Sequence, residues 1–122
     1  MTHSPGFLAL VNDAKKHVRE TNIEGYRKMV DGKEKHILVD VREESEWAAG
    51  HAAGAVHLSK GIIERDIETK VPDKNATLVL YCGGGFRSAL AGEALQKMGY
   101  THVISLDGGW RAYKESGLPV EK

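Results

Sequence analysis

The chain alternates between short apolar runs and amphipathic segments, and this alternation limits the folds open to it. Apolar runs typical of strands covered on both faces occupy residues 37–41, 55–58, 78–81 and 103–106. Segments with helical spacing of apolar residues occupy 23–30, 43–49, 62–67, 86–98 and 110–116. Strands separated by helices pair in parallel through right-handed crossovers. The sequence therefore predicts an α/β fold: an open, mainly parallel sheet of four to five strands with helices on both faces.

A further helical pattern precedes this series. Phe7, Val11 and Ala14 recur at helical spacing behind the start signal Ser4-Pro5. A chain of 122 residues is long enough to bury the core of one domain. We predict a single domain over residues 1–122, with residues 5–20 as an accessory N-terminal helix. We expect this helix to cover the sheet or, alternatively, to present a docking surface to a partner.

The charge balance limits the partners. Lys and Arg number 17 and Asp and Glu number 17, so the chain lacks the net field with which nucleic-acid and membrane-surface binders attract their partners. The longest early apolar run, residues 7–11, is too short for a signal peptide or a membrane span. We expect a cytoplasmic protein that binds neither nucleic acid nor membrane.

Cysteine and histidine content argues against a metal site. Cys82 is the only cysteine, which excludes an intrachain disulfide and a cysteine-rich zinc site and fits a reducing compartment. The six histidines show no tight ligand spacing, and we expect His51 and His57 to satisfy backbone groups. The sequence therefore predicts no metal and no cofactor.

The segment from Cys82 to Arg87 is the strongest candidate site. It joins an apolar strand to a helix and contains three successive glycines, residues 83–85. Such a turn can aim several backbone N–H groups at one point, the helix adds the positive end of its dipole, and Arg87 adds a permanent charge. All three favour a reactive thiolate and would also hold an oxyanion. The alternative is an inert buried thiol in a tight turn.

Two other strand ends are predicted to meet this loop, because the carboxyl ends of parallel strands share one edge. At the end of the first strong strand, we expect Asp40 and Arg42 to form hydrogen bonds or an ion pair that supports the loop. Glu46 follows Arg42 by four residues and is expected to pair with it. Trp110 follows the third strand and is interpreted as a packing residue or a wall of the pocket.

The ordered set of motifs resembles a single-domain rhodanese, a sulfurtransferase that carries sulfur as a cysteine persulfide. The resemblance spans about residues 23–120 and rests on residues 38–42, 46–47, 50–55, 82–88 and 106–110. It implies that Cys82 is the nucleophile and Arg87 the arginine that closes the loop. It also assigns substrate binding to Gly83, Gly84, Gly85, Phe86 and Ser88.

The sequence departs from the family pattern in two places. Ala52 and Ala53 stand where the family commonly has a branched apolar residue and a proline. The loop interior also lacks the extra basic residue of some thiosulfate-using members. Binding a dianion would then need another cation, and we predict Lys60 or Arg65 in that role.

The resemblance implies transfer of sulfane sulfur from thiosulfate to cyanide, a small thiol or a protein thiol, without a cofactor. The alternative is a sulfur-relay module that takes sulfur from a protein donor. A small cysteine-dependent phosphatase is a third reading, although phosphatases of this fold carry one more residue between the cysteine and the arginine than the four present here. Such an enzyme would also need a general acid; Asp107 is the candidate, although we interpret it as an ordinary turn residue.

Overall fold

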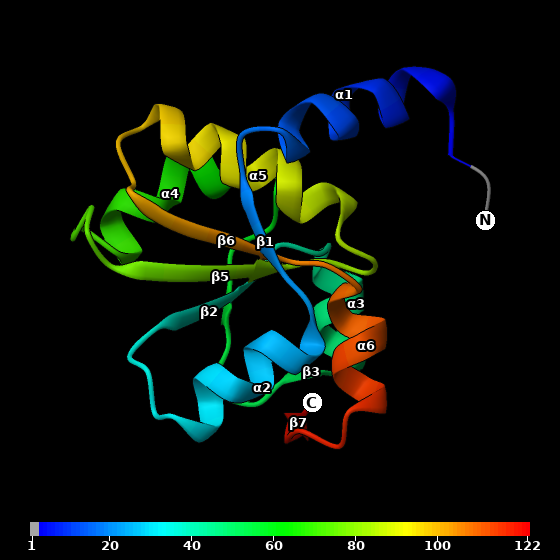
Figure 1. Cartoon of the computed structure of the whole chain (residues 1–122), viewed down its shortest axis with the longest axis vertical. Helices are drawn as coiled ribbons and strands as arrows, with labels where there is room; N and C mark the ends of the chain where they lie inside the picture. The colour runs from blue at the N-terminus through cyan, green and yellow to red at the C-terminus, as the bar shows by residue number, and fades with distance from the viewer. Residues whose placement is uncertain (1–2) are drawn as a thin grey trace.

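The computed structural model describes residues 3–122 and contains a five-stranded parallel sheet in the order β1-β6-β5-β2-β4 (Figure 1). The strands are β1 (Arg19–Thr21), β2 (Ile37–Asp40), β4 (Val56–His57), β5 (Thr77–Tyr81) and β6 (His102–Leu106). Two short strands, β3 (His51–Ala52) and β7 (Val120–Glu121), form a separate antiparallel pair. The predicted fold class is confirmed.

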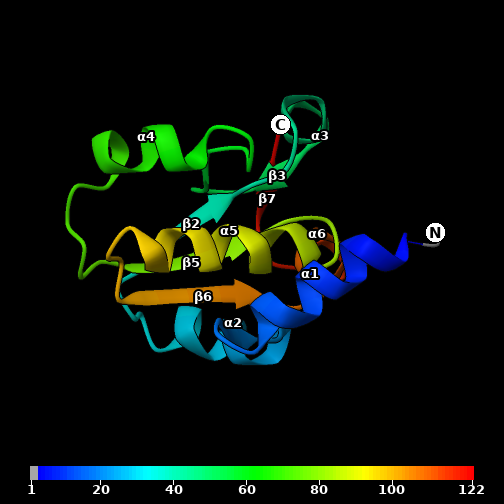
Figure 2. The same ribbon diagram turned by 90° about the horizontal axis from the view of Figure 1, so that it is seen from above.

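Helices lie on both faces of the sheet (Figures 1 and 2). One face carries α1 (Pro5–Lys15), α4 (Ile63–Lys70) and α5 (Phe86–Lys97), and the other carries α2 (Ile23–Asp31) and α6 (Gly109–Glu115). The short helix α3 (Glu44–Ala49) follows the end of β2. Among residues 3–122, no helix is both long and apolar enough to cross a membrane.

Strand β5 lies at the centre of the sheet and divides the core between its two faces. Leu78 and Leu80 pack into the cluster under α4 and α5, whereas Val79 and Tyr81 pack into the cluster under α2 and α6. All four side chains are fully buried. Burying one large apolar side chain contributes about 1.5–3 kcal/mol. Cys82 follows directly, so it is attached to the central, buried strand of the sheet.

The N-terminal helix is shorter than the sequence predicts. It ends at Lys15 rather than near residue 20, and residues 19–21 form β1 at the edge of the sheet, beside β6. The apolar spacing does continue to Val18, which is buried, but Val18 belongs to the turn between the two elements. The Arg-Glu-Thr sequence of β1 lacks the apolar alternation of a strand because this short edge strand is largely exposed.

Candidate active site

The loop after β5 is fastened to the start of α6. The backbone N–H of Trp110 donates to the carbonyl of Cys82 at 2.7 Å. The N–H of Gly108 donates to the carbonyl of Gly84 at 3.2 Å. The loops after β5 and β6 therefore meet at the carboxyl edge of the sheet, as the sequence predicts.

Two glycines make this close approach possible. Gly85 has φ +105° and ends the loop as the N-cap of α5, in a backbone conformation that disfavours other residues. At Gly109, φ is +49°, and a Cβ would collide with the carbonyl group of Cys82. A side chain at Gly109 would push α6 away from the loop.

The sulfur of Cys82 lies among polar groups although the residue is only 1% exposed. The backbone N–H of Gly85 donates to Sγ at 3.1 Å. The thiol in turn contacts the Ser88 hydroxyl at 3.6 Å, and that hydroxyl is hydrogen-bonded to Ser105. The N-terminus of α5, a helix of 12 residues, begins four positions after Cys82. An amide donor and a helix N-terminus are features that stabilise an anion, and both face the sulfur side of this loop.

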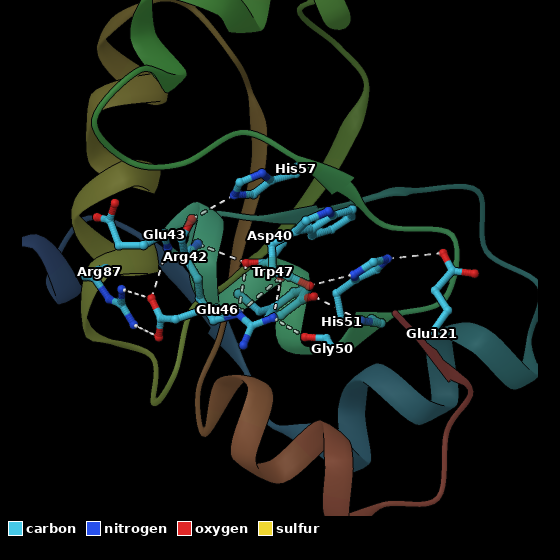
Figure 3. Close-up of polar contacts among 12 residues, drawn as sticks. Asp40, Arg42, Glu43, Glu46, Trp47, Gly50, His51, His57, Arg87 and Glu121 are labelled. Carbon is cyan, nitrogen blue, oxygen red and sulfur yellow. Dashed lines mark hydrogen bonds and ion pairs between the residues drawn. The ribbon is translucent and has the colours of Figure 1, made fainter.

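Arg87 is paired with Glu46 (Figure 3). Two guanidinium nitrogens donate to the two carboxylate oxygens at 2.8 and 3.2 Å. The hydrogen bond from Arg87 holds the pKa of Glu46 below its ordinary value, and the bond to Glu46, with attraction to Cys82, raises the pKa of Arg87. The prediction that Glu46 pairs with Arg42 is wrong, because Arg42 has other partners and α3 turns Glu46 toward the loop.

Arg42 forms a second, buried pair with Asp40 (Figure 3). One of its nitrogens lies 2.8 Å from a carboxylate oxygen and 2.7 Å from the carbonyl of Gly50. Burial acts to lower the pKa of Arg42, but hydrogen bonding and attraction to Asp40 outweigh it and raise that pKa. The expected ion pair is confirmed. The guanidinium also lies 4.7 Å from the ring centre of Trp110, so Trp110 packs on this pair.

A cavity of about 730 Å³ opens over the cysteine. Of the predicted site residues, it is lined by Cys82, Gly83, Gly84, Phe86, Arg87 and Glu46. Gly85 and Ser88 contact the sulfur without lining the cavity, and Trp110 does not line it. The sequence reasoning missed three lining residues: His3, Phe7 and Arg111. Phe7 belonged to the apolar stripe of the first helix and Arg111 followed a double glycine, but neither pattern indicated a cavity.

Lys60 and Arg65 do not reach this cavity. Both follow β4, an edge strand that β2 separates from β5. Arg65 has a side chain that is 74% exposed, and it binds the neighbouring Asp66 at 2.7 Å. The structure therefore does not support either residue as the extra cation, and Arg111 is the second arginine at the cavity.

His51 supports the loop that follows α3. Its ring stacks on Trp47 with ring centres 3.4 Å apart, and Nδ1 is hydrogen-bonded to the Trp47 carbonyl at 3.0 Å (Figure 3). Nε2 lies 3.4 Å from Glu121. His57 likewise bonds the carbonyl of Arg42 at 2.8 Å. The prediction that these two histidines satisfy backbone groups is confirmed.

Within residues 3–122, one group has the donor atoms for a metal ion. Side-chain atoms of Asp13, His17 and Glu93 lie within 4.8 Å of one another. The first two are exposed, and none of the three lines the cavity over Cys82. Exposed groups of this composition are common without a bound ion, so we assign no metal site to these three residues.

The fold and the loop define a class: α/β domains that hold one cysteine in a glycine turn between a parallel strand and a helix. The profile of the rhodanese-like domain family matches residues 22–116, and the chain belongs to this family of sulfurtransferases. Over 84 residues it is 40% identical to thiosulfate sulfurtransferase PspE of Escherichia coli K12, a match that covers 69% of this chain and 77% of PspE.

Two further proteins are similar to this chain. The chain is 30% identical over 94 residues to a Bacillus subtilis protein named "Putative sulfur carrier protein YrkF", covering 77% of this chain and half of YrkF. A solved structure from Rhodopseudomonas palustris, described as a "Possible Tyrosine Phosphatase" of unknown function, superimposes with a TM-score of 0.84 and 27% identity. That superposition covers 99% of this chain and 98% of the other.

Proposed function

We propose that this chain transfers sulfane sulfur from thiosulfate to cyanide or a thiol acceptor through a persulfide on Cys82. The observation that carries the proposal is the position of the Cys82 sulfur, which receives an N–H donor from Gly85 and lies at a cavity that Arg87 and Arg111 line. The name of PspE supports thiosulfate as the donor.

The reaction has two balanced steps. The Cys82 thiolate attacks the outer sulfur of thiosulfate, the sulfur–sulfur bond of thiosulfate breaks, and sulfite leaves with the electron pair. The persulfide sulfur then passes to cyanide, which becomes thiocyanate, and the Cys82 thiolate returns. Neither step requires a proton for the leaving group, and a persulfide extends only about 2 Å beyond the cysteine sulfur. A turn with four residues between Cys82 and Arg87 suits that small group.

The charges at the cavity argue against phosphatase chemistry. Such an enzyme needs a carboxylic acid or another proton donor for the leaving oxygen. Among residues 3–122, Glu46 is the one carboxyl group that lines the cavity, and Arg87 holds it in the ionised form. Asp107 does not line the cavity, and its side chain is exposed at the turn.

A sulfur relay that receives sulfur from a protein is the second candidate. The likeness to YrkF, which is named a putative sulfur carrier protein, favours it. Both candidates use Cys82, so saturable turnover with thiosulfate separates them.

Intact-protein mass spectrometry tests the proposal. The native chain and the Cys82→Ser variant are mixed with thiosulfate, desalted and then treated with cyanide. We expect the native chain alone to gain one sulfur atom and to lose it to cyanide. No gain on the native chain would overturn thiosulfate as the donor and favour the relay. Hydrolysis of an aryl phosphate that disappears in Cys82→Ser would favour the phosphatase.

A further inference from the structure

Helix α1 contributes to the cavity although it lies outside the matched family profile, which begins at residue 22. His3 and Phe7 both line the cavity, beside Phe86 of α5. The ring of His3 lies 5.3 Å from that of Phe7 and 4.8 Å from that of Phe86, between ring centres. The two phenylalanine rings are 6.3 Å apart. We call these three residues the aromatic wall.

The aromatic wall is held in place by the packing of α1 on α5, which Figure 2 shows side by side. Val11 and Ala14 anchor the helix, since both are almost fully buried. Gly92 of α5 lies so close to the N-terminal segment that a Cβ there would come within 2.9 Å of Val18. Phe7 on the docked helix and Phe86 on α5 therefore present fixed rings to a ligand, and His3, which precedes α1, packs against both.

The size of the cavity exceeds the needs of thiosulfate or cyanide. A volume of about 730 Å³ falls within the roughly 300–1,000 Å³ of pockets that hold organic ligands. Aromatic faces attract apolar and aromatic groups. The cavity therefore offers an apolar surface that neither small anion would use.

Arg111 gives the same cavity a cationic group. Its backbone N–H is bonded to the Gly83 carbonyl at 3.3 Å, which places it next to the loop. The fork of Arg87 is occupied by Glu46, whereas Arg111 forms no ion pair within residues 3–122. The guanidinium of Arg111 can therefore bind a carboxylate on a ligand.

We propose that the aromatic wall and Arg111 select, as sulfur acceptor, an organic thiol with an apolar body and a carboxylate. This inference rests on the proposed persulfide cycle and assigns its second substrate. The acceptor sulfur attacks the outer sulfur of the Cys82 persulfide, and the bond to Cys82 breaks. Cys82 leaves as the thiolate, while the thiol proton stays on the organic persulfide formed. No oxidant or reductant is consumed.

The test separates loading of Cys82 from its discharge. The native chain is loaded with thiosulfate, desalted and mixed with 4-mercaptophenylacetate, 4-methylthiophenol or cyanide. The rate of sulfur loss is followed by mass spectrometry. We expect the carboxylated thiol to discharge the persulfide faster than its methyl analogue. Equal rates for these two thiols would overturn the role of Arg111.

Substitutions at the cavity test which residues cause the preference for the aromatic, carboxylated thiol. Phe7→Ala is expected to lower the ratio of the aromatic thiol rate to the cyanide rate about fivefold or more. His3→Ala, which precedes the first turn of α1, is expected to lower it in the same direction without disturbing the helix. Leu10→Ala is the matched control on α1, because Leu10 is 63% exposed and does not line the cavity.

Arg111→Gln should remove most of the advantage of the carboxylated thiol over its methyl analogue. Its control is Lys114→Gln, the same loss of charge on the exposed side of α6. Unchanged ratios in Phe7→Ala, His3→Ala and Arg111→Gln would overturn the inference and leave the persulfide cycle standing. Failure of thiosulfate to load Cys82 would overturn the proposed function and this inference together.

Discussion

Two arginine–carboxylate pairs stand at the carboxyl edge of the sheet in different surroundings. The side chains of Asp40 and Arg42 are 0% and 4% exposed, whereas those of Glu46 and Arg87 are 37% and 30% exposed. The first pair also binds the Gly50 carbonyl and packs on an aromatic ring. The second lines the cavity over the cysteine.

The two pairs contain the same kinds of charged group, and their different burial gives them different effects on stability. A buried charge is costly unless it keeps its partner, so the inner pair is tied to stability. A half-exposed pair contributes little to stability because water screens it. Its groups can therefore exchange partners, and an incoming anion can compete with Glu46 for Arg87. We infer that the inner pair supports the fold, and we propose that the outer pair takes part in the reaction.

Asp40→Ala should produce the largest effect. Removing the carboxylate leaves the guanidinium of Arg42 buried without its ion partner, and we expect a loss of about 3–5 kcal/mol in the free energy of unfolding. Urea denaturation followed by circular dichroism measures it. Glu46→Gln is the control, because its amide oxygen can still accept the hydrogen bond from the backbone N–H of Glu43, and it should cost less than about 1 kcal/mol. Equal losses in the two variants would contradict the comparison.

Replacing each arginine by lysine should separate the two roles. Arg87→Lys is expected to lower the rate constant for loading Cys82 from thiosulfate about tenfold, since lysine lacks the planar fork, with little change in stability. Arg42→Lys should instead lower the urea midpoint. Single-turnover loading and urea denaturation of both variants test this expectation. A loading defect confined to Arg42→Lys would reverse the assignment.

The pH dependence of the outer pair should be the smallest effect. Arg87 lowers the pKa of Glu46 from its ordinary value of 4.5, so near that pH the folded chain binds fewer protons than the unfolded chain. The stabilisation of the folded chain by the Glu46–Arg87 pair is therefore present above pH 4.5, and it is lost as the pH falls through the pKa of Glu46 in the folded chain. Thermal unfolding of the native chain and Glu46→Gln should differ by no more than about 4 °C near pH 7, and the difference should shrink below pH 4. A difference that grows toward acid pH would contradict this sign.

Local pattern was sufficient for the inner strands of the parallel sheet and for the cysteine loop, but not for the edge strand β1. The apolar runs that form β2, β5 and β6 are covered on both faces of the sheet. Strands of this kind have nearly continuous apolar sequences, which can be recognised without the structure. The loop from Cys82 to Arg87 is contiguous, and its glycines and helix start have local signatures. The ion pair of Asp40 with Arg42 could also be predicted from the sequence, because the two residues are only two positions apart.

Contacts between distant segments were decided only by the tertiary structure. Glu46 meets Arg87 across 41 positions because α3 and α5 start at the same edge of the sheet, and the nearer Arg42 is occupied by Asp40. Lys60 and Arg65 follow an edge strand that lies two strands from Cys82. His3, Phe7 and Arg111 reach the cavity because α1 docks on α5 and α6 docks on the loop. Sequence spacing carries no information on such docking, because it depends on the packing of faces that lie far apart along the chain.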